Sequence, residues 1–293
     1  MNTEYDSCTL CHRKCSVNRN KGETGFCKMT SSLKVSRASL HMWEEPIISG
    51  TRGSGTIFFT GCSLGCVYCQ NSKISAGQGG HEVTEEELSS MMLSLERDGA
   101  HNINLVTPTH FTPGIICAVR IAREKGLSVP IVYNTGSYDT VENIKSLDGT
   151  VQIYLPDLKY YRSETAKALS YASDYVTSAR ECIREMVRQT GEPKISSAGL
   201  LERGTVVRVL LLPSHVAEAK LSVKYLYSTY GDSIYISLMS QYTPKNNCPS
   251  PLDRRVTRAE YYELVDYAEK LGVTNAFTQE LTSAEESFIP DFE

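Results

Sequence analysis

Three cysteines lie within eight consecutive residues of the segment TGCSLGCVYCQN, residues 60–71. They are Cys62, Cys66 and Cys69, in the spacing C-x3-C-x2-C. A structural zinc site uses four protein ligands, and disulfide frameworks need an even number of cysteines, so three thiols fit neither. Three thiolates can bind three irons of a [4Fe–4S] cluster, which is normally held by four cysteines. The fourth iron would then be open to a substrate or cofactor, as in reactive metal centres.

A simpler interpretation of the three cysteines competes with a cluster. Their positions are i, i+4 and i+7, so they could line one face of a buried helix, where free cysteines are common. Two glycines, Gly61 and Gly65, precede and interrupt the triplet. Glycine favours tight turns in which separate side chains can converge, and it disfavours a helix. The segment therefore favours a loop that binds an iron–sulfur cluster.

The elements that must position this loop follow from the hydrophobic pattern. Runs rich in β-branched and aromatic residues predict strands at 56–61, 102–107, 130–135, 151–156, 206–213, 233–240 and 275–281. Amphipathic patterns predict helices at 84–99, 114–125, 174–189, 217–230 and 257–271, and Thr84 and Glu87 have the spacing of a capping box. This alternation predicts a parallel sheet with crossover helices, open or curled into a barrel. The chemistry should gather at the carboxyl ends of the strands.

Residues 1–50 differ from the rest of the chain, because they contain four cysteines but little periodic hydrophobicity. The spacing C-x2-C-x3-C-x11-C places these cysteines at Cys8, Cys11, Cys15 and Cys27. Four thiolates can close a tetrahedral site, and either zinc or an auxiliary iron–sulfur cluster would satisfy it. We therefore expect a cysteine-rich, metal-binding appendage over residues 1–50 and an α/β domain over residues 51–293.

Composition excludes some function classes. The 293 residues are 41% hydrophobic and 22% charged, with a net charge of −4. This balance predicts no general affinity for nucleic acid or for an anionic membrane. The segment MNTEYDSCTL lacks the apolar region of a signal peptide, and no apolar run is long enough to cross a bilayer. Ten clustered cysteines then indicate metal or redox chemistry in a reducing cytoplasm.

With the aromatic Tyr68 before its third cysteine, the triplet resembles the motif of the radical S-adenosylmethionine enzymes. The segment GCSLGCVYCQN is similar to that of the pyruvate formate-lyase activating enzymes, and HMWEEPIISG, GSGTIFF, VTPTH, PDLKYY and SLMSQYTP resemble an uncharacterised, activase-like branch of that group. The resemblance implies a partial (β/α)6, TIM-like barrel. It also implies a [4Fe–4S] cluster and S-adenosylmethionine, which is cleaved reductively to a 5′-deoxyadenosyl radical that abstracts hydrogen.

The predicted strand ends supply the remaining candidate site residues. With the resemblance, they predict cofactor-binding roles for Tyr68, Thr107, Thr109, His110, Asn134, Asp157 and Arg208, and catalytic roles for Asp157, Lys159 and His110. Asp157 and Lys159 would face the same way on a continuing strand, although a surface ion pair is the alternative. Arg208 interrupts an apolar run and needs a partner if it is buried, so a structural salt bridge competes with a cofactor contact. The segments around Thr107 and Asn134 could simply end strands.

One further group lies just before the first predicted strand. His41, Glu44 and Glu45 could transfer protons, or they could tie the appendage to the barrel.

Three functions are compatible with these patterns. The first is hydrogen abstraction from a glycine of a partner glycyl-radical enzyme, with a flavodoxin or a ferredoxin-type protein as reductant, as the resemblance suggests. The second is radical modification of a peptide or small molecule. The third is a non-catalytic iron–sulfur protein that carries electrons or clusters. A carrier is expected to ligate its cluster fully, and it needs no cofactor pocket at the strand ends.

Overall fold

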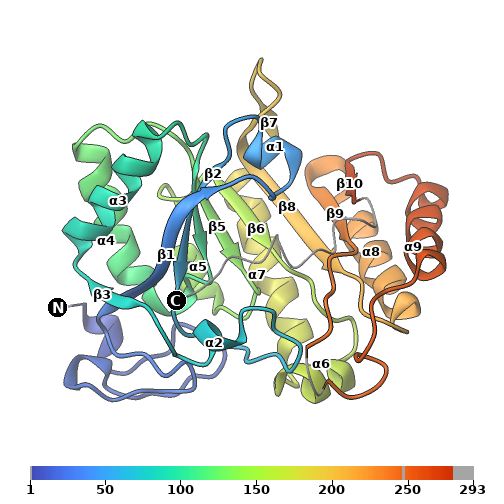
Figure 1. Ribbon diagram of the computed structural model, residues 1–293, viewed down its shortest axis with the longest axis horizontal. Helices are drawn as coiled ribbons and strands as arrows, with labels where there is room; N and C mark the ends of the chain where they lie inside the picture. Colours follow the sequence, from blue (N-terminus) through green and yellow to red (C-terminus); the bar gives the residue numbers. More distant parts are fainter. Residues whose placement is uncertain (1, 246–247, 280–293) are drawn as a thin grey trace.

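The computed structural model describes residues 2–245 and 248–279, which form an α/β fold around one large sheet (Figure 1). Within these residues the sheet contains ten strands in the order β10-β9-β8-β6-β5-β4-β2-β1-β3, with β7 paired to β8. Seven of them are parallel and follow chain order: β2 (Ser54–Phe59), β4 (Ile103–Val106), β5 (Ile131–Thr135), β6 (Ile153–Pro156), β8 (Leu201–Leu210), β9 (Tyr235–Met239) and β10 (Ala276–Thr278). These are the seven predicted strands, although residues 280 and 281 of the last one lie outside the described residues.

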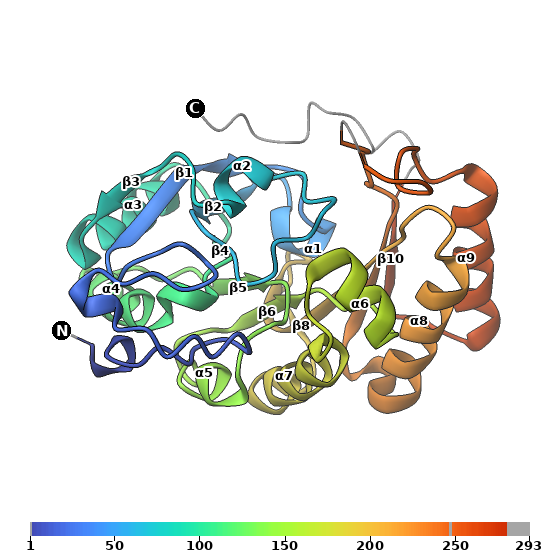
Figure 2. The same ribbon diagram turned by 90° about the horizontal axis from the view of Figure 1, so that it is seen from below.

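Helices cover the outer side of the curved sheet, where they follow one another along the strands (Figure 2). They are α3 (Glu85–Arg97), α4 (Thr112–Glu124), α5 (Val141–Lys145), α7 (Tyr175–Thr190), α8 (Val216–Tyr230) and α9 (Arg258–Leu271). The capping box that begins α3 is confirmed, since the Glu87 backbone N–H donates to Thr84 Oγ1 and the Thr84 N–H donates to the Glu87 carboxylate. Right-handed crossovers between strands in sequential order place these crossover helices on one side, and the carboxyl ends of the strands meet at one edge.

The first strand differs from the prediction. Strand β1 (Leu33–His41) lies within the segment that we expected to be a loop-rich appendage, but it pairs antiparallel with β2 and belongs to the main sheet. Only Leu33 and Val35 are buried in this strand. The rest of the strand is half-exposed or exposed, so it produces no apolar run that would mark a strand in the sequence. The expected boundary at residue 50 therefore does not coincide with the edge of the sheet.

Besides four 3-10 turns, five short elements complete the described fold. They are β3 (His81–Val83), which pairs with the start of β1, β7 (Lys194–Ile195), α1 (Pro46–Ser49), α2 (Ser72–Ser75) and α6 (Ser163–Ser170). Among the described residues, no helix is both long enough and apolar enough to span a membrane.

Candidate functional site

The loop after β2 carries the cysteine triplet at the carboxyl edge of the sheet. Gly61 and Gly65 have φ angles of 91° and 64°, in the left-handed region that favours glycine. A Cβ atom on Gly61 would lie 2.7 Å from the carbonyl oxygen of Cys27 and 2.6 Å from Cγ of Met29. Glycine at this position therefore lets the N-terminal segment pack directly against the start of the cysteine loop. The helical interpretation of the triplet is wrong, because residues 60–71 contain no helix.

The three thiols are close enough to influence one another. Burial, together with Cys66 and Cys69, raises the pKa of the Cys62 thiol to about 12. Burial, together with Cys66, also raises the pKa of Cys69. Thiolates are costly in such a site unless a cation accompanies them. The Leu64 backbone N–H donates to Cys62 Sγ at 3.4 Å and the Ser170 hydroxyl donates to Cys66 Sγ at 2.9 Å, which supports thiolates at these positions. This donor set fits an iron–sulfur cluster.

A cavity of about 630 Å³ opens beside this loop, within the range of about 300–1,000 Å³ that is typical of small-molecule sites. The sequence-predicted residues that line it are Cys66, Tyr68, Cys69, Asn134, Asp157, Lys159 and Arg208. They come from the cysteine loop, β5, the segment after β6, and β8. Sheet topology thus brings together residues that are far apart in the chain.

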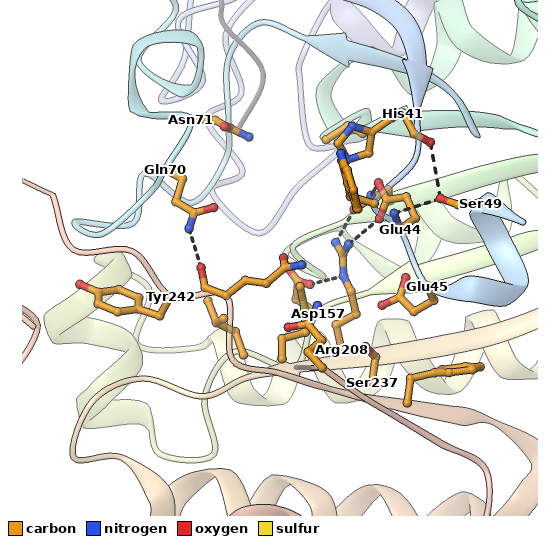
Figure 3. Close-up of a pocket in the computed structure, with 18 of the residues that line it drawn as sticks. His41, Glu44, Glu45, Ser49, Gln70, Asn71, Asp157, Arg208, Ser237 and Tyr242 are labelled. Atoms are coloured by element: carbon orange, nitrogen blue, oxygen red, sulfur yellow. Dashed lines mark hydrogen bonds and ion pairs between the residues drawn. The ribbon is translucent and has the colours of Figure 1, made fainter. Parts of the chain in front are cut away.

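Arg208 is the centre of a buried polar network in this cavity (Figure 3). Its Nε lies 2.9 Å from Asp157 Oδ1, its Nη1 lies 3.3 Å from Glu44 Oε2, and its Nη2 donates to Asn134 Oδ1 at 2.5 Å. The side chain of Arg208 is only 12% exposed. The ion pairs and hydrogen bonds compensate the desolvation of the guanidinium, so the network can orient the charged groups of a ligand.

Asp157 bridges the two cations of the cavity. Its second oxygen accepts a hydrogen bond from Lys159 Nζ at 2.5 Å. Burial alone would raise the pKa of Asp157, but Lys159 and Arg208 hold it below its ordinary value. Burial alone would also lower the pKa of Lys159, yet Asp157 holds it above its ordinary value. The pair is therefore charged, and the alternative of a surface ion pair is wrong because both side chains are mostly buried.

Two carboxylates that precede β2 complete the polar side of the cavity. Burial raises the pKa of Glu44, although Arg208 and a hydrogen bond from Asn104 Nδ2 at 2.7 Å oppose this effect. Burial also raises the pKa of Glu45, again with Arg208 acting in the opposite direction. The buried Oε2 of Glu45 has no hydrogen-bond partner among the described residues. An unsatisfied buried acceptor that lines a cavity is suited to receive a donor from a ligand.

A chain of hydrogen-bonded hydroxyl groups packs against the cysteine loop. The Tyr68 and Tyr160 hydroxyls are 2.8 Å apart, and the Tyr160 hydroxyl lies 2.6 Å from Ser170 Oγ, which donates to Cys66. Both tyrosine side chains are buried. The chain connects the aromatic residue of the motif to a cysteine sulfur, and it excludes water from that side of the loop.

The residues that follow β4 lie outside this cavity. Val106 at the end of β4 lines the cavity, but Thr107, Thr109 and His110 do not. Thr107 adopts a left-handed conformation with φ of 58°, and the chain then continues in a 3-10 turn over Thr109–Phe111. This turn buries the side chain of His110, whose Nε2 lies 2.8 Å from the Thr60 carbonyl oxygen. These three residues therefore lie outside the lining of the cavity, and their predicted cofactor and catalytic roles stay predictions.

The buried His110 should make the stability of the fold sensitive to acid. Burial, with Arg19, lowers its pKa to about 3, although the bond to Thr60 opposes this. In the unfolded chain His110 binds a proton below about pH 6.5, whereas in the folded chain it stays neutral. The contribution of His110 to the free energy of unfolding is therefore complete above that pH and is lost as the pH falls towards 3. At pH 5 this group should reduce the free energy of unfolding by about 2 kcal/mol relative to pH 7. Urea unfolding of wild type and His110→Gln at both pH values measures the difference.

The substitution of the exposed His81 by glutamine is the control for this measurement. His81→Gln should retain the wild-type pH dependence, whereas His110→Gln should lose about 2 kcal/mol of it. Equal pH dependence in wild type and His110→Gln would show that His110 is not the group responsible.

The four N-terminal cysteines lie beside the carboxyl edge of the sheet. Cys11 forms a β-bridge with Asp139 after β5, and Cys27 and Cys8 are buried. Among residues 2–245 and 248–279, no three His, Cys, Asp or Glu side chains converge closely enough to hold a single metal ion. A [4Fe–4S] cube spaces its ligands more widely than one ion does, so this finding is compatible with the cysteine loop after β2.

Several residues of the site could not be assigned from the sequence. For Glu44 and Glu45 the sequence is compatible with two roles, and the structure places both in the cavity with Arg208. Asn104 was missed, because an asparagine within an apolar strand has no marker except its polarity. Its position in the buried strand β4 was the available signal, since a buried amide needs a partner.

Comparison with known proteins agrees with this geometry. Residues 56–193 match the sequence profile of the Radical SAM superfamily. The uncharacterised protein MJ0674 of Methanocaldococcus jannaschii is 26% identical over 277 residues, covering 92% of this chain and 76% of that protein. The crystal structure of Streptococcus suis SuiB bound to S-adenosylmethionine aligns with a TM-score of 0.53 and 12% identity over 77% of this chain and 50% of SuiB.

A second solved structure has a similar fold. HydG, a maturase of the [FeFe]-hydrogenase, aligns with a TM-score of 0.52 and 18% identity over 74% of this chain and 48% of HydG. The chain thus spans about half the length of these structures. At such identities the likeness concerns the fold, while the profile match covers the cysteine triplet and four of the parallel strands. Residues 56–193 of this chain are thus similar to the Radical SAM superfamily, and they contain the cysteine triplet.

Proposed function

We propose that this protein is a radical S-adenosylmethionine enzyme, with a [4Fe–4S] cluster held by Cys62, Cys66 and Cys69 at the carboxyl edge of a partial (β/α)6 barrel. One observation carries the proposal: two of these three cysteines line the same cavity as the buried Arg208 network. When bound, such a cluster supplies the electron for reductive cleavage of S-adenosylmethionine to a 5′-deoxyadenosyl radical, which abstracts hydrogen from a substrate.

The residues of the cavity would bind and orient the cofactor. Its methionine portion carries an ammonium and a carboxylate, and the cavity offers groups of both charges. Glu45 has an unsatisfied oxygen for a donor, whereas Lys159 and Arg208 supply positive charge. The ion pairs of Asp157 with both cations hold these side chains in place before a ligand arrives. Such preorganisation lowers the cost of orienting a charged ligand.

Product analysis after anaerobic reconstitution with iron and sulfide tests this proposal. The reduced, reconstituted protein should bind S-adenosylmethionine and form 5′-deoxyadenosine and methionine, measured by chromatography and mass spectrometry. Protein that was not reconstituted, and reactions without reductant, should form neither product. A protein that carries the cluster but does not bind the cofactor would refute the proposal and favour an electron or cluster carrier.

The substrate class is proposed from the rim of the cavity. Met42 and Trp43 line the cavity and are 43% and 55% exposed, and the neighbouring Leu40 is 39% exposed. Exposed apolar groups at the mouth of a charged cavity suit a polypeptide better than a small polar metabolite. We therefore favour a protein substrate, with a glycine of a glycyl-radical enzyme as the leading choice.

Electron paramagnetic resonance distinguishes the substrate alternatives. With pyruvate formate-lyase as the probe, transfer of the radical to a glycine should produce the signal of an organic radical that persists after the activating protein is removed. Formation of 5′-deoxyadenosine without this signal would favour the alternative of a peptide- or small-molecule-modifying enzyme. SuiB, with the same fold, has also been solved bound to its precursor peptide SuiA.

Two features of the cellular setting belong to the same proposal. A flavodoxin or a ferredoxin-type protein would supply the electron, because S-adenosylmethionine cleavage at a cluster is a reductive step. A reducing cytoplasm is supported by the ten cysteines, all of which lie among the described residues and are free thiols there.

A further inference from the structure

The N-terminal segment has only a small apolar core of its own. Its own hydrophobic cluster contains Tyr5, Cys8 and Leu10, with Val17 packed against them. Before β1 its described regular structure is limited to two 3-10 turns of three residues each. A segment with so little apolar burial needs a second source of stability, such as a metal or disulfides. All four of its cysteines are free thiols.

Backbone N–H groups are directed at the sulfurs of this segment. The Phe26 N–H donates to Cys15 Sγ at 3.4 Å, and the N–H groups of Arg13 and Met29 donate to Cys11 and Cys27. In the last two pairs the donor lies two residues after the cysteine. N–H groups of this kind stabilise thiolates and are the usual outer contacts of metal-bound cysteines.

Gly25 permits the close approach of one of these sulfurs. A Cβ atom at residue 25 would lie 2.7 Å from Cys15 Sγ, which is closer than real Cβ atoms approach a heavy atom. The backbone around Gly25 therefore forms a cradle for the Cys15 sulfur that a larger residue would fill.

A buried cation points to negative charge on the sulfurs. Arg19 is 1% exposed, and its guanidinium donates to the carbonyl oxygens of Met29 and Thr30 and approaches Cys8 Sγ at 3.7 Å. It also lies 4.5 Å from the centre of the Tyr5 ring. Among the described residues no carboxylate forms an ion pair with Arg19. A buried guanidinium without an anion is costly, and thiolate ligands of a metal would supply that anion.

We propose that the four N-terminal cysteines bind one metal centre, and that this centre holds Arg13 against the cysteine loop after β2. The ligands are Cys8, Cys11, Cys15 and Cys27. Four thiolates close the coordination of zinc or of an iron–sulfur cluster, so the centre is structural and leaves no open position. The first part of the proposal is independent of the proposed function, whereas the second part rests on the cluster at the loop after β2.

Arg13 lies between two of these cysteines and connects them to the cysteine loop after β2. Its Nε donates to the Ser63 carbonyl at 2.8 Å and its Nη2 donates to the Leu64 carbonyl at 3.1 Å. The same guanidinium donates to the carbonyls of Ser170 and Tyr171 at the end of α6. Arg13 is therefore a positioning residue, because it fixes the backbone between Cys62 and Cys66 together with the serine that donates to Cys66.

The distances between the four cysteine sulfurs determine how a metal could bind them. Because they do not yet converge at single-ion distances, a zinc ion would have to draw them together, whereas a cluster would span a wider spacing. Metal binding of either kind is then coupled to ordering of the segment. Cobalt(II) tests for a single tetrahedral ion, and iron with sulfide tests for a cluster.

The first experiment uses a chain without the radical site, the triple variant Cys62→Ala/Cys66→Ala/Cys69→Ala. After anaerobic titration it should bind about one cobalt(II) per chain with thiolate charge-transfer absorption, or hold a reconstituted iron–sulfur chromophore. Adding Cys15→Ala should abolish this binding, and adding Cys117→Ala on α4 should not. If the triple variant does not fold, metal counts of Cys15→Ala and Cys117→Ala in the otherwise wild-type chain give the same comparison. No stoichiometric binding of either metal would refute the site.

The second experiment tests the role of Arg13 in the chain with an intact radical site. Arg13→Met should lose the radical-site cluster to a chelator about tenfold faster than wild type and should change the paramagnetic resonance spectrum of the reduced cluster. Arg13→Lys should fall between them, and Arg120→Met on the exposed face of α4 should match wild type. An unchanged spectrum and rate in Arg13→Met would refute the positioning role. Failure of the radical chemistry would leave the result of the first experiment standing.

Discussion

Replacement of Arg208 by methionine should lower the free energy of unfolding by about 3–5 kcal/mol, because it removes one partner of a buried ion-pair network. Methionine fills much of the same space but leaves Glu44 and Asp157 without their guanidinium partner. S-adenosylmethionine binding to the reconstituted protein should be lost as well. Urea unfolding and calorimetric titration measure the two effects.

The pH dependence of the free energy of unfolding tests the origin of this destabilisation. In the variant the two carboxylates lose the cation that favours their charged form, so their pKa values rise in the folded state. An acid with a raised folded pKa stabilises the fold as pH falls, so the deficit should be smaller at pH 5 than at pH 8. The added substitutions Glu44→Gln and Asp157→Asn should restore part of the stability. A deficit that does not depend on pH or on these substitutions would indicate lost packing instead of unpaired charge.

The second large effect concerns the cysteine loop. If the proposed cluster is bound here, replacement of Cys66 by alanine should remove its iron and reduce 5′-deoxyadenosine formation to background. The loss should exceed the roughly 10–100-fold effect of removing an outer contact of a metal site, because a ligand itself is removed. Cys66 is the most informative of the three, since it lines the cavity and its sulfur accepts the hydrogen bond from Ser170.

A matched cysteine elsewhere provides the control for this prediction. Cys117 is half-buried on α4 and does not line the cavity, so Cys117→Ala should retain iron content and product formation. Iron analysis, visible absorption and product chromatography should be carried out on both variants in parallel. Product formation by Cys66→Ala at the wild-type rate would show that the cysteine triplet does not hold the reactive cluster.

The parallel sheet and the cysteine loop could be predicted because their signals are local. A strand covered by helices is apolar along its length, so runs such as residues 102–107 and 130–135 stand out from their surroundings. The Cys62–Cys69 triplet likewise occupies consecutive turns of one loop, with Gly61 in the conformation that its residue type suggests. Strands β1, β3 and β7 were missed; β3 and β7 are only three and two residues long, and the exposed half of β1 carries no apolar run.

Which side chains line the cavity depends on contacts between segments that are distant in the sequence. His110 follows β4 in the sequence, so the rule that strand ends converge would place it at the cavity. Instead, Thr107 adopts a left-handed conformation that turns the chain, and the His110 ring is buried against Thr60. Glu44 precedes β2, yet it reaches Arg208 on β8, 164 residues away. No periodicity relates these residues, since the sheet curvature and the order of strands decide which side chains meet.

The sequence by itself determined the alternating α/β architecture, the cysteine triplet and the Asp157, Lys159 and Arg208 candidates, because residue type and short-range spacing specify these features. Only the tertiary structure decided that Arg208 joins Asp157 and Glu44 in one buried network and that His110 stays outside it. It also placed Arg13 against the backbone of a loop about 50 residues away. A buried charge is stable only beside its partner, and the partner is chosen by the packing of the whole sheet.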